Sequence, residues 1–342
     1  MAIVKSNAYG HGIDLVVTAI EKKVDWFGVV NLEEAFILRK LKIKKPILVL
    51  SYFSFSQISQ AIKQNISLVV YTKGQINNIN SVAKKLNKKA RVHLKIDTGT
   101  NRLGISPAEV EDFIETVKKN KFIFLQGIFS HFAASEESAH YTKIQLDIFK
   151  TVARKSEKII GRQLIKHIAC SAATLLNKNN QLDLVRMGLA LYGLYSSPQT
   201  AKVMKKARLY LKPVLSLKTQ VIQVKNVPKG SYIGYGCAYT APVAQKIAVL
   251  PVGYFEGYVR ALSNKSYVLI KGVRCPVRGR ICMNLMMVDV TAVEAVIVGD
   301  EAVLIGKQGR EGITVDELAE LSKTINYEIV ARLNPMIKRV LI

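Results

Sequence analysis

The sequence contains no long apolar run, and this absence narrows the classes of protein to which the chain can belong. No stretch approaches the roughly 18 apolar residues that a membrane-spanning helix requires. Residues 1–12 turn polar after Val4 and include no apolar signal region. We therefore expect a cytoplasmic protein that does not enter a membrane.

Cysteine is scarce, and the spacing of the few cysteines excludes two common uses. The four are Cys170, Cys237, Cys275 and Cys282. These spacings fit neither a metal-binding knuckle nor the dense disulfide framework of a small secreted domain. The five histidines provide no trio with the spacing of metal ligands. We expect reduced thiols and no metal site.

Acidic residues are half as frequent as basic ones, with 25 Asp plus Glu against 50 Lys plus Arg and a net charge of +25. Such a balance raises the question of nucleic-acid binding. The lysines, however, fall in scattered pairs such as Lys22-Lys23 and Lys88-Lys89, without interleaved aromatic residues on which bases could stack. The pattern indicates a solvated basic surface that attracts anionic ligands, and no nucleic-acid partner. Binding to nonspecific DNA that weakens steeply with salt would support the alternative.

The length of the chain and its apolar pattern predict two domains. At 342 residues the chain exceeds the size at which one hydrophobic core usually keeps growing. In residues 1–207, short apolar runs rich in β-branched residues alternate with helix-like segments, as in repeated βα units around a parallel sheet. Eight runs occur, near residues 2–4, 26–30, 47–50, 67–71, 91–96, 126–129, 166–169 and 184–187. Eight strands close a TIM barrel, so we predict the α/β fold class with a (β/α)8 barrel in residues 1–207.

A different pattern begins after the barrel and predicts a mainly antiparallel β C-terminal domain in residues 208–342. Its long β-rich runs lie near residues 214–224, 247–252, 267–270 and 286–290, and turn residues such as Pro228-Lys229-Gly230 separate them. Capping signals mark helix starts in both domains: Asn31 with Glu34, Ser106 with Glu109, and Thr314 with Glu317.

The segment most informative about function runs from Val4 to Gly12 and reads Val-Lys-Ser-Asn-Ala-Tyr-Gly-His-Gly. Its lysine, Lys5, ends the first expected strand, on the face where TIM barrels keep their active sites. The amine of such a lysine can form a Schiff base with a carbonyl cofactor, and partial burial lowers its pKa by disfavouring the ammonium form. Taken as a single residue, an ordinary surface lysine remains the alternative.

The whole nonapeptide resembles the cofactor-lysine motif of the alanine racemases, and further segments similar to that family follow in the family's order along the chain. The resemblance implies an isomerase that interconverts L-alanine and D-alanine with pyridoxal 5'-phosphate (PLP). It implies that Lys5 holds PLP and serves as one of two catalytic bases. Supply of D-alanine for peptidoglycan is the physiological role that the resemblance implies.

The segment Leu94–Gly104 is similar to the part of the family that binds the substrate carboxylate. There the resemblance implies that Arg102 is the anchor, because a guanidinium fits a carboxylate with paired, charge-assisted hydrogen bonds. In some members the lysine at the position of Lys95 is carbamylated and orients this arginine. An unmodified strand lysine is the alternative.

The segment Val185–Gly193 resembles the eighth-strand motif, in which Arg186 faces the pyridine nitrogen of PLP. Arginine keeps its own proton, since its pKa lies above about 12, and so weakens the cofactor as an electron sink and favours simple proton exchange at Cα. A decarboxylase of similar barrel-plus-β design would be expected to carry a carboxylate there. The other cofactor-binding residues that the resemblance implies are Tyr9, His131, Ser171, Gly188, Leu189 and Tyr327.

The segment Ile233–Thr240 resembles the one that carries the family's catalytic tyrosine, which corresponds to Tyr235. Racemisation removes a proton from one face of Cα and returns one to the other, so two groups on opposite faces suit it. The resemblance implies that Lys5 serves one enantiomer and Tyr235 of the partner subunit the other, in a homodimer with shared active sites. A tyrosine begins near pKa 10, so neighbouring positive charge must favour its phenolate. The backbone amide of Met283 is expected at the substrate carboxylate.

The chain departs from the family in three places near the expected substrate entrance. Asparagine stands at Asn284 where aspartate is usual, and Phe255 and Glu256 replace a smaller residue and aspartate.

Family members also carry roughly thirty residues before the lysine strand, whose absence would leave a sheet edge uncovered. Two alternatives therefore stay open: a PLP-binding homologue inactivated by truncation, and a racemase of broader amino-acid specificity. A barrel that only binds PLP would lack the β-rich domain.

Overall fold

The computed structural model describes residues 1–342, which divide into two compact units. One unit comprises residues 1–8 and 12–212, and the other comprises residues 9–11 and 213–342. The short segment 9–11 thus belongs to the second unit, although both of its neighbours in sequence belong to the first. None of the helices combines the length and apolar character needed to cross a membrane.

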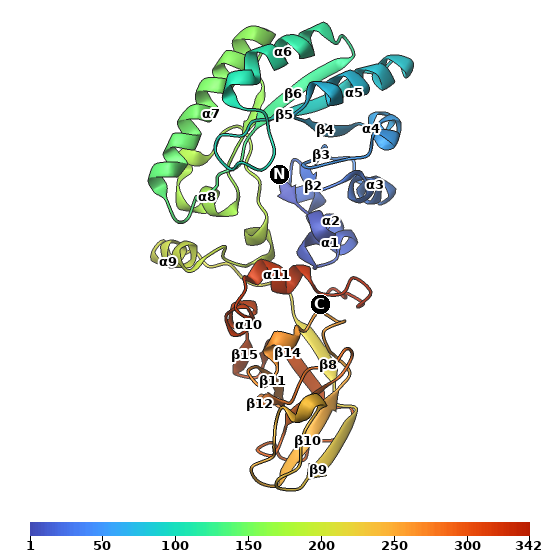
Figure 1. Ribbon diagram of the computed structural model, residues 1–342, viewed down its shortest axis with the longest axis vertical. Helices are drawn as coiled ribbons and strands as arrows, with labels where there is room; N and C mark the ends of the chain where they lie inside the picture. The colour runs from blue at the N-terminus through green and yellow to red at the C-terminus, as the bar shows by residue number, and fades with distance from the viewer. The chain divides into compact units, whose positions relative to one another are not determined.

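The first unit is built around a parallel sheet with helices between successive strands (Figure 1). The strands lie in chain order, each paired with the next: β1 (Ala2–Ile3), β2 (Phe27–Val29), β3 (Ile47–Val49), β4 (Ile66–Val70), β5 (Ala90–Lys95), β6 (Ile123–Phe129) and β7 (Ile165–His167). The helices are α1 (Lys5–Tyr9), α2 (Ile13–Ile20), α3 (Leu32–Lys40), α4 (Ile58–Lys63), α5 (Lys73–Lys85), α6 (Val110–Lys119), α7 (Ala139–Ile160), α8 (Ser171–Leu176) and α9 (Pro198–Lys206). The predicted TIM-like class is confirmed.

The eighth expected strand, near residues 184–187, does not form as a strand. Its backbone nevertheless bonds to both ends of the seven-stranded sheet. On the β7 side, Arg186 N donates to Ala169 O at 3.0 Å; on the β1 side, Ile3 N donates to Met187 O at 2.8 Å. Only Met187 forms a ladder bridge, because the segment bonds to β7 through its other residues and leaves the extended conformation at Gly188. The ring therefore closes through single hydrogen bonds instead of a regular strand.

Burial explains why the parallel strands read as continuous apolar runs. Every residue of β2, β3 and β4 is buried, since the barrel interior covers one face of each strand and helices cover the other. The capping signals act as expected. Asn31 Oδ1 accepts the amide of Glu34 at 3.0 Å, Ser106 and Glu109 form a reciprocal capping box, and Thr314 Oγ1 accepts the amide of Glu317.

The second unit is an antiparallel sheet with two helices after it. Its strands are β8 (Leu217–Gln220), β9 (Gln223–Val227), β10 (Gln245–Leu250), β11 (Tyr267–Ile270), β12 (Val273–Arg278), β13 (Met286–Asp289), β14 (Glu301–Gln308) and β15 (Glu311–Ile313). They lie in the order β15-β14-β11-β12-β13-β10-β9, and β8 pairs with β14. The helices are α10 (Val315–Ser322) and α11 (Asn326–Ala331).

The apolar run at 214–224 forms two strands where the sequence suggests one. The break falls where the chain changes partners: Val221 N donates to Asp300 O, next to β14, whereas Ile222 N donates to Val249 O in β10. A continuous apolar run cannot reveal such a change, because both halves are suited to strands.

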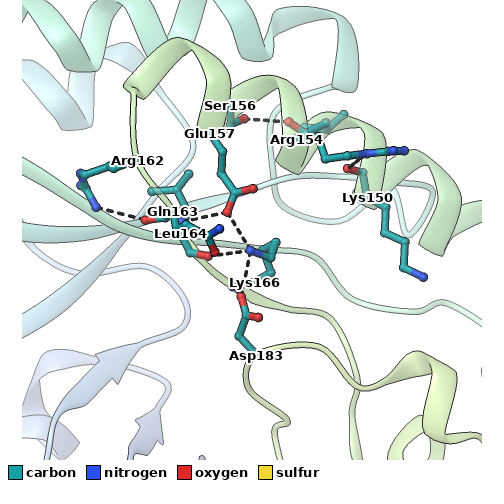
Figure 2. A network of polar contacts seen from close by, with 10 residues as sticks. Lys150, Arg154, Ser156, Glu157, Arg162, Gln163, Leu164, Lys166 and Asp183 are labelled. Carbon is teal, nitrogen blue, oxygen red and sulfur yellow. Dashed lines mark hydrogen bonds and ion pairs between the residues drawn. The ribbon is translucent and has the colours of Figure 1, made fainter.

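A partly buried ion-pair network connects the end of α7 to β7 and to Asp183, which directly precedes the ring-closing segment 184–187 (Figure 2). Lys166 Nζ lies 2.7 Å from Glu157 Oε1 and 3.1 Å from Asp183 Oδ2, and it also donates to the Leu164 carbonyl. Asp183 in addition accepts the backbone amide of Lys166 at 2.9 Å. The side chains of Lys166 and Glu157 are only 20% and 19% exposed, so water replaces these bonds poorly.

We expect Lys166→Ala to lower the free energy of unfolding by about 1–3 kcal/mol, because it leaves two carboxylates and a carbonyl without their cation. Urea denaturation at neutral pH measures the change. Lys150→Ala is the matched control, since Lys150 is an exposed lysine on α7, the helix that carries Glu157. Equal losses in the two variants would contradict a stabilising role for the network.

Candidate active site

Lys5 opens a turn of left-handed backbone. The four residues 6–9 all have φ between 52° and 55°. Left-handed conformation costs a residue other than glycine about 1–2 kcal/mol, and strain of this kind persists where the surroundings enforce it. Two bonds tie the turn to the start of α2: the Gly12 amide donates to Asn7 O at 3.0 Å, and Asn7 Oδ1 accepts the Ile13 amide at 2.9 Å. Lys5 is thus presented on a rigid, strained support.

Four basic side chains of the first unit influence one another: Lys5, Lys95, Arg102 and Arg186. Burial and then Arg102 lower the pKa of Lys5, although Glu34 partly opposes them. Lys95 is 7% exposed, and burial, Arg102 and Arg186 lower its pKa to about 8. The neutral amine of each lysine is therefore favoured relative to an exposed lysine, and the group as a whole attracts anions.

The loop that carries Arg102 is shaped by one carboxylate. Asp97 accepts four backbone amides at 2.9–3.1 Å, those of Gly99, Thr100, Asn101 and Arg102. Burial alone would raise the pKa of Asp97, but these amides outweigh it and lower the pKa. The exposed Arg102 side chain borders a depression lined by Lys95, Ile96, Asp97, Thr100, Arg102, Leu103 and His131. The sequence offered Asp97 inside the Leu94–Gly104 motif, yet only the structure shows its positioning role.

Arg186 is the most deeply buried cation of the site, with 5% of its surface exposed. Its NH2 group donates to Ser130 O at 2.7 Å, to Ile168 O at 2.9 Å and to His131 Nδ1 at 3.0 Å. Its NH1 group donates to His167 Nδ1 at 2.9 Å. Burial lowers the pKa of Arg186 to about 10, so the guanidinium stays charged at neutral pH. No bond within the chain uses its Nε, which leaves this donor available to a ligand.

A chain of histidines extends from Arg186 into the barrel core. Because Arg186 is only a donor, His167 accepts at Nδ1 and keeps its proton on Nε2, which lies 3.1 Å from His93 Nδ1. The same logic makes His93 an acceptor at Nδ1. Burial lowers the pKa of His93 to about 3 and that of His167 well below its usual range. His131 keeps part of its surface accessible, yet its burial and four nearby cations lower its pKa to about 3.

Backbone amides and a hydroxyl converge after the ring-closing segment. Ser171, the first residue of α8, accepts the amide of Gly188 at 2.8 Å and that of Ala190 at 3.4 Å through its Oγ. Leu189, which lies between Gly188 and Ala190 in the sequence, is the first residue of the 3₁₀ turn Leu189–Tyr192. Grouped amides at the start of helical turns bind anions such as phosphate. The structure thus brings together Ser171, Gly188 and Leu189.

In the second unit, Tyr9 lies beside Tyr327 of α11, with ring centroids 6.2 Å apart. The next residue explains the close approach of these segments. Gly10 has φ of +79°, and a Cβ there would lie 1.9 Å from Val330 O. Arg339 donates to the Gly10 carbonyl at 2.9 Å and fixes the same loop from the C-terminal tail. The sequence motif supplies the glycine, but Arg339 carries no signal that would reveal its role.

Tyr235 stands at the tip of a hairpin and is 73% exposed. The hairpin is held by Ile233 N donating to Tyr239 O at 2.9 Å. Gly236 has φ of +68°, a backbone conformation that favours glycine, and a Cβ there would lie 2.5 Å from the end of the Arg280 side chain, which packs against this turn.

Met283 is likewise exposed, by 55%, on a loop bound to the segment 253–256. Phe255 N donates to Met283 O at 2.9 Å. Glu256 connects the same two segments, because it accepts from Asn284 Nδ2 at 2.7 Å and from the Gly253 amide at 2.8 Å. Two of the three departures from the family pattern, Asn284 and Glu256, are therefore hydrogen-bonded partners.

Two family models match the chain: the N-terminal domain of alanine racemases over residues 1–196 and their C-terminal domain over residues 214–341. The chain belongs to the alanine racemase family. The alanine racemase of Symbiobacterium thermophilum is 41% identical over 341 residues, which cover 99% of this chain and 89% of the relative. That of Methanococcus maripaludis is 39% identical over 345 residues, which cover 99% and 91%.

Solved structures agree with this assignment to the alanine racemases. The alanine racemase of Clostridium difficile 630 matches with a TM-score of 0.90 and 37% identity, over 97% of this chain and 86% of that chain. The Bacillus anthracis enzyme with bound L-Ala-P gives 0.88 and 33%, over 97% and 85%. A histidine racemase of Leuconostoc mesenteroides gives 0.89 and 27%, over 100% and 91%. The family, the fold and the isomerase class expected from the motifs are confirmed.

The histidine chain of this alanine racemase family member makes its stability depend on pH. Unfolded histidines bind protons near pH 6.5, whereas His93 and His131 in the folded chain bind them only near pH 3. Within this window the unfolded state holds more protons, so stability falls as pH falls, by up to about 1.4 kcal/mol per pH unit for each histidine. Above pH 6.5 the contribution is fully present.

We expect His93→Gln to reduce this slope by about the share of one histidine. Urea unfolding at several pH values from roughly 4.5 to 7, which cover the upper part of the titration window, gives the slopes. His140→Gln is the control, because His140 is an exposed histidine on α7. The same slope in wild type and His93→Gln would show that His93 is not buried as a neutral group.

Proposed function

We propose that the enzyme racemises L-alanine and D-alanine with PLP, using Lys5 and Tyr235 of the partner subunit as its two bases. The observation that carries the proposal is the group of four cations that influence one another. Two of them, Lys95 and Arg102, line the depression, and a third, Arg186, is a buried guanidinium whose Nε takes part in no bond of the chain. Such a site suits a ligand that carries a phosphate, a carboxylate and an aromatic nitrogen acceptor.

The residues present fit PLP. Ser171 and the amides around Gly188 and Leu189 would hold its phosphate, with Tyr9 and Tyr327 as further phosphate contacts. Arg186 Nε would donate to the pyridine nitrogen, and His131 would lie against the ring. Lys5 would hold the cofactor covalently through its neutral amine. When bound, PLP makes the Cα proton of the substrate acidic enough to remove.

Arg102 would bind the substrate carboxylate, together with the backbone amide of Met283. We further propose that Lys95 is carbamylated: its neutral amine attacks carbon dioxide, loses a proton and becomes an anion. The pKa of about 8 supports this step, because the amine is partly unprotonated at neutral pH. The negative carbamate would relieve repulsion from Arg102 and Arg186 and would orient the Arg102 guanidinium.

Two bases on opposite faces of Cα would exchange its proton. The exposure of Tyr235 and Met283 supports the homodimer, since both side chains are available to a second copy of the chain. We propose that D-alanine made in the cytoplasm serves peptidoglycan synthesis. A racemase of broader specificity is the second candidate, favoured by the hydrogen-bonded pair Asn284 and Glu256, which stands where the family usually has two aspartates.

Purified protein supplied with PLP should convert L-alanine to D-alanine, and Lys5→Ala should abolish the conversion. Tyr235→Phe should lower kcat by about 10²–10⁴, the usual contribution of a general acid or base. In deuterated water this variant should still exchange the Cα hydrogen of one enantiomer without inverting it, because one base remains. Tyr232→Phe is the control, an exposed tyrosine on the same hairpin. Conversion of serine or other amino acids at rates similar to that of alanine would favour the second candidate.

Mixing two inactive variants tests whether the bases come from different subunits. A dimer of one Lys5→Ala chain and one Tyr235→Phe chain has one complete site if Tyr235 acts across the interface, and none if it acts within its own chain. After random exchange of subunits, activity should recover to about one quarter of wild type. No recovery, with heterodimers shown by mass spectrometry, would contradict the shared site.

A further inference from the structure

Glu34 is the acidic residue whose charge raises the pKa of Lys5, and both of its carboxylate oxygens accept hydrogen bonds from backbone amides. Its Oε1 accepts the amide of Ser6 at 2.5 Å and that of Asn7 at 3.4 Å, and its Oε2 accepts the amide of Val30 at 3.0 Å. Ser6 and Asn7 are the first two left-handed residues after Lys5, and Val30 directly follows β2. One carboxylate thus joins the strained turn to the end of the neighbouring strand.

The position of Glu34 is itself fixed. It lies in the first turn of α3, where Asn31 Oδ1 accepts its backbone amide at 3.0 Å, and its side chain is half-buried. The left-handed turn directs the Ser6 and Asn7 amides to one side, where no helix carbonyl is available to them. An acceptor with two oxygens is required there, since Val30 needs a partner as well.

We propose that Glu34 is a positioning residue for Lys5, which holds the left-handed turn in the conformation that presents the lysine amine to the cofactor. This inference rests on the proposed role of Lys5. The proposal predicts that both carboxylate oxygens are needed, Oε1 for the turn and Oε2 for Val30. The amide of a glutamine has the same shape but only one acceptor oxygen, so in Glu34→Gln an NH2 group must face one of the three backbone N–H donors.

Covalent loading of the full-length chain tests the proposal. PLP is removed and added back over a range of pH, and the Lys5 adduct is trapped with borohydride and measured by mass spectrometry. In wild type the rate should rise to a plateau as the Lys5 ammonium loses its proton. Glu34→Gln should lower the plateau by about tenfold, because a displaced amine reacts slowly even when it is neutral. The midpoint should also move to lower pH, since a negative charge is lost.

The outcomes separate positioning from charge. A midpoint that shifts under an unchanged plateau would show that Glu34 acts only through its charge and would overturn the proposal, as would no change at all. Glu33→Gln is the matched control: Glu33 precedes it on α3, is exposed and binds only the side chain of Gln57, so its plateau and midpoint should equal those of wild type. Glu34→Asp keeps two acceptor oxygens and should give an intermediate plateau; it decides the matter if Glu34→Gln does not fold.

A second readout does not depend on PLP. Hydrogen exchange of a peptide that covers residues 4–12 should be slow in wild type and in Glu33→Gln, and at least about tenfold faster in Glu34→Gln, because the Ser6 and Asn7 amides lose their acceptor. Failure of wild type to load PLP would reject the proposed cofactor role of Lys5 and leave this readout to judge the turn. Equal exchange in wild type and Glu34→Gln would overturn the role of Glu34.

Discussion

The buried guanidinium of Arg186 is the interaction on which the architecture of the barrel site depends. A charge in the core is tolerated when hydrogen bonds compensate its burial, and both terminal nitrogens of Arg186 are bonded, with acceptors that include carbonyls at the ends of two strands, Ser130 after β6 and Ile168 after β7. Its own segment closes the ring against β1, from which Lys5 emerges. The side chain of Arg186 therefore joins the ends of two strands, and the backbone that follows it joins β1.

The electrostatics of the site depend on burial and on this charge. Burial is the larger cause, and the neighbouring cations add to it: the pKa of Lys95 falls to about 8, and that of His131 falls to about 3. The amine of Lys95 is therefore partly unprotonated at neutral pH beside the charged guanidinium of Arg186. A lysine whose pKa is lowered in this way is better suited to proton transfer at neutral pH than an exposed one.

Much of this could be predicted from the sequence, for reasons that also set the limit. The strands β2, β3 and β4 were identifiable because both of their faces are covered, which makes their apolar runs continuous. The segment 184–187 shows the same run, but its partners on two sides are spaced so that no regular ladder forms. The motifs supplied Lys5, Arg102 and Tyr235, whereas Glu34 was recognised only as part of a helix cap. Its long-range acceptor role depends on the left-handed turn, which no residue in the segment requires: residues 6–9 include no glycine.

The two proposed bases differ in how the fold supports them, and this difference bears on how activity is controlled. Lys5 is held by a turn whose strain is offset by bonds within its own unit, so its geometry is set when the barrel folds. Tyr235 stands exposed on a hairpin tip and has no acceptor or donor of its own chain at its ring. If it serves a second subunit, the site is complete only in the dimer, and the rate per chain falls with dilution below the dissociation constant. The position of Lys5 is then set by the fold of one chain, whereas the supply of Tyr235 depends on the concentration of dimer.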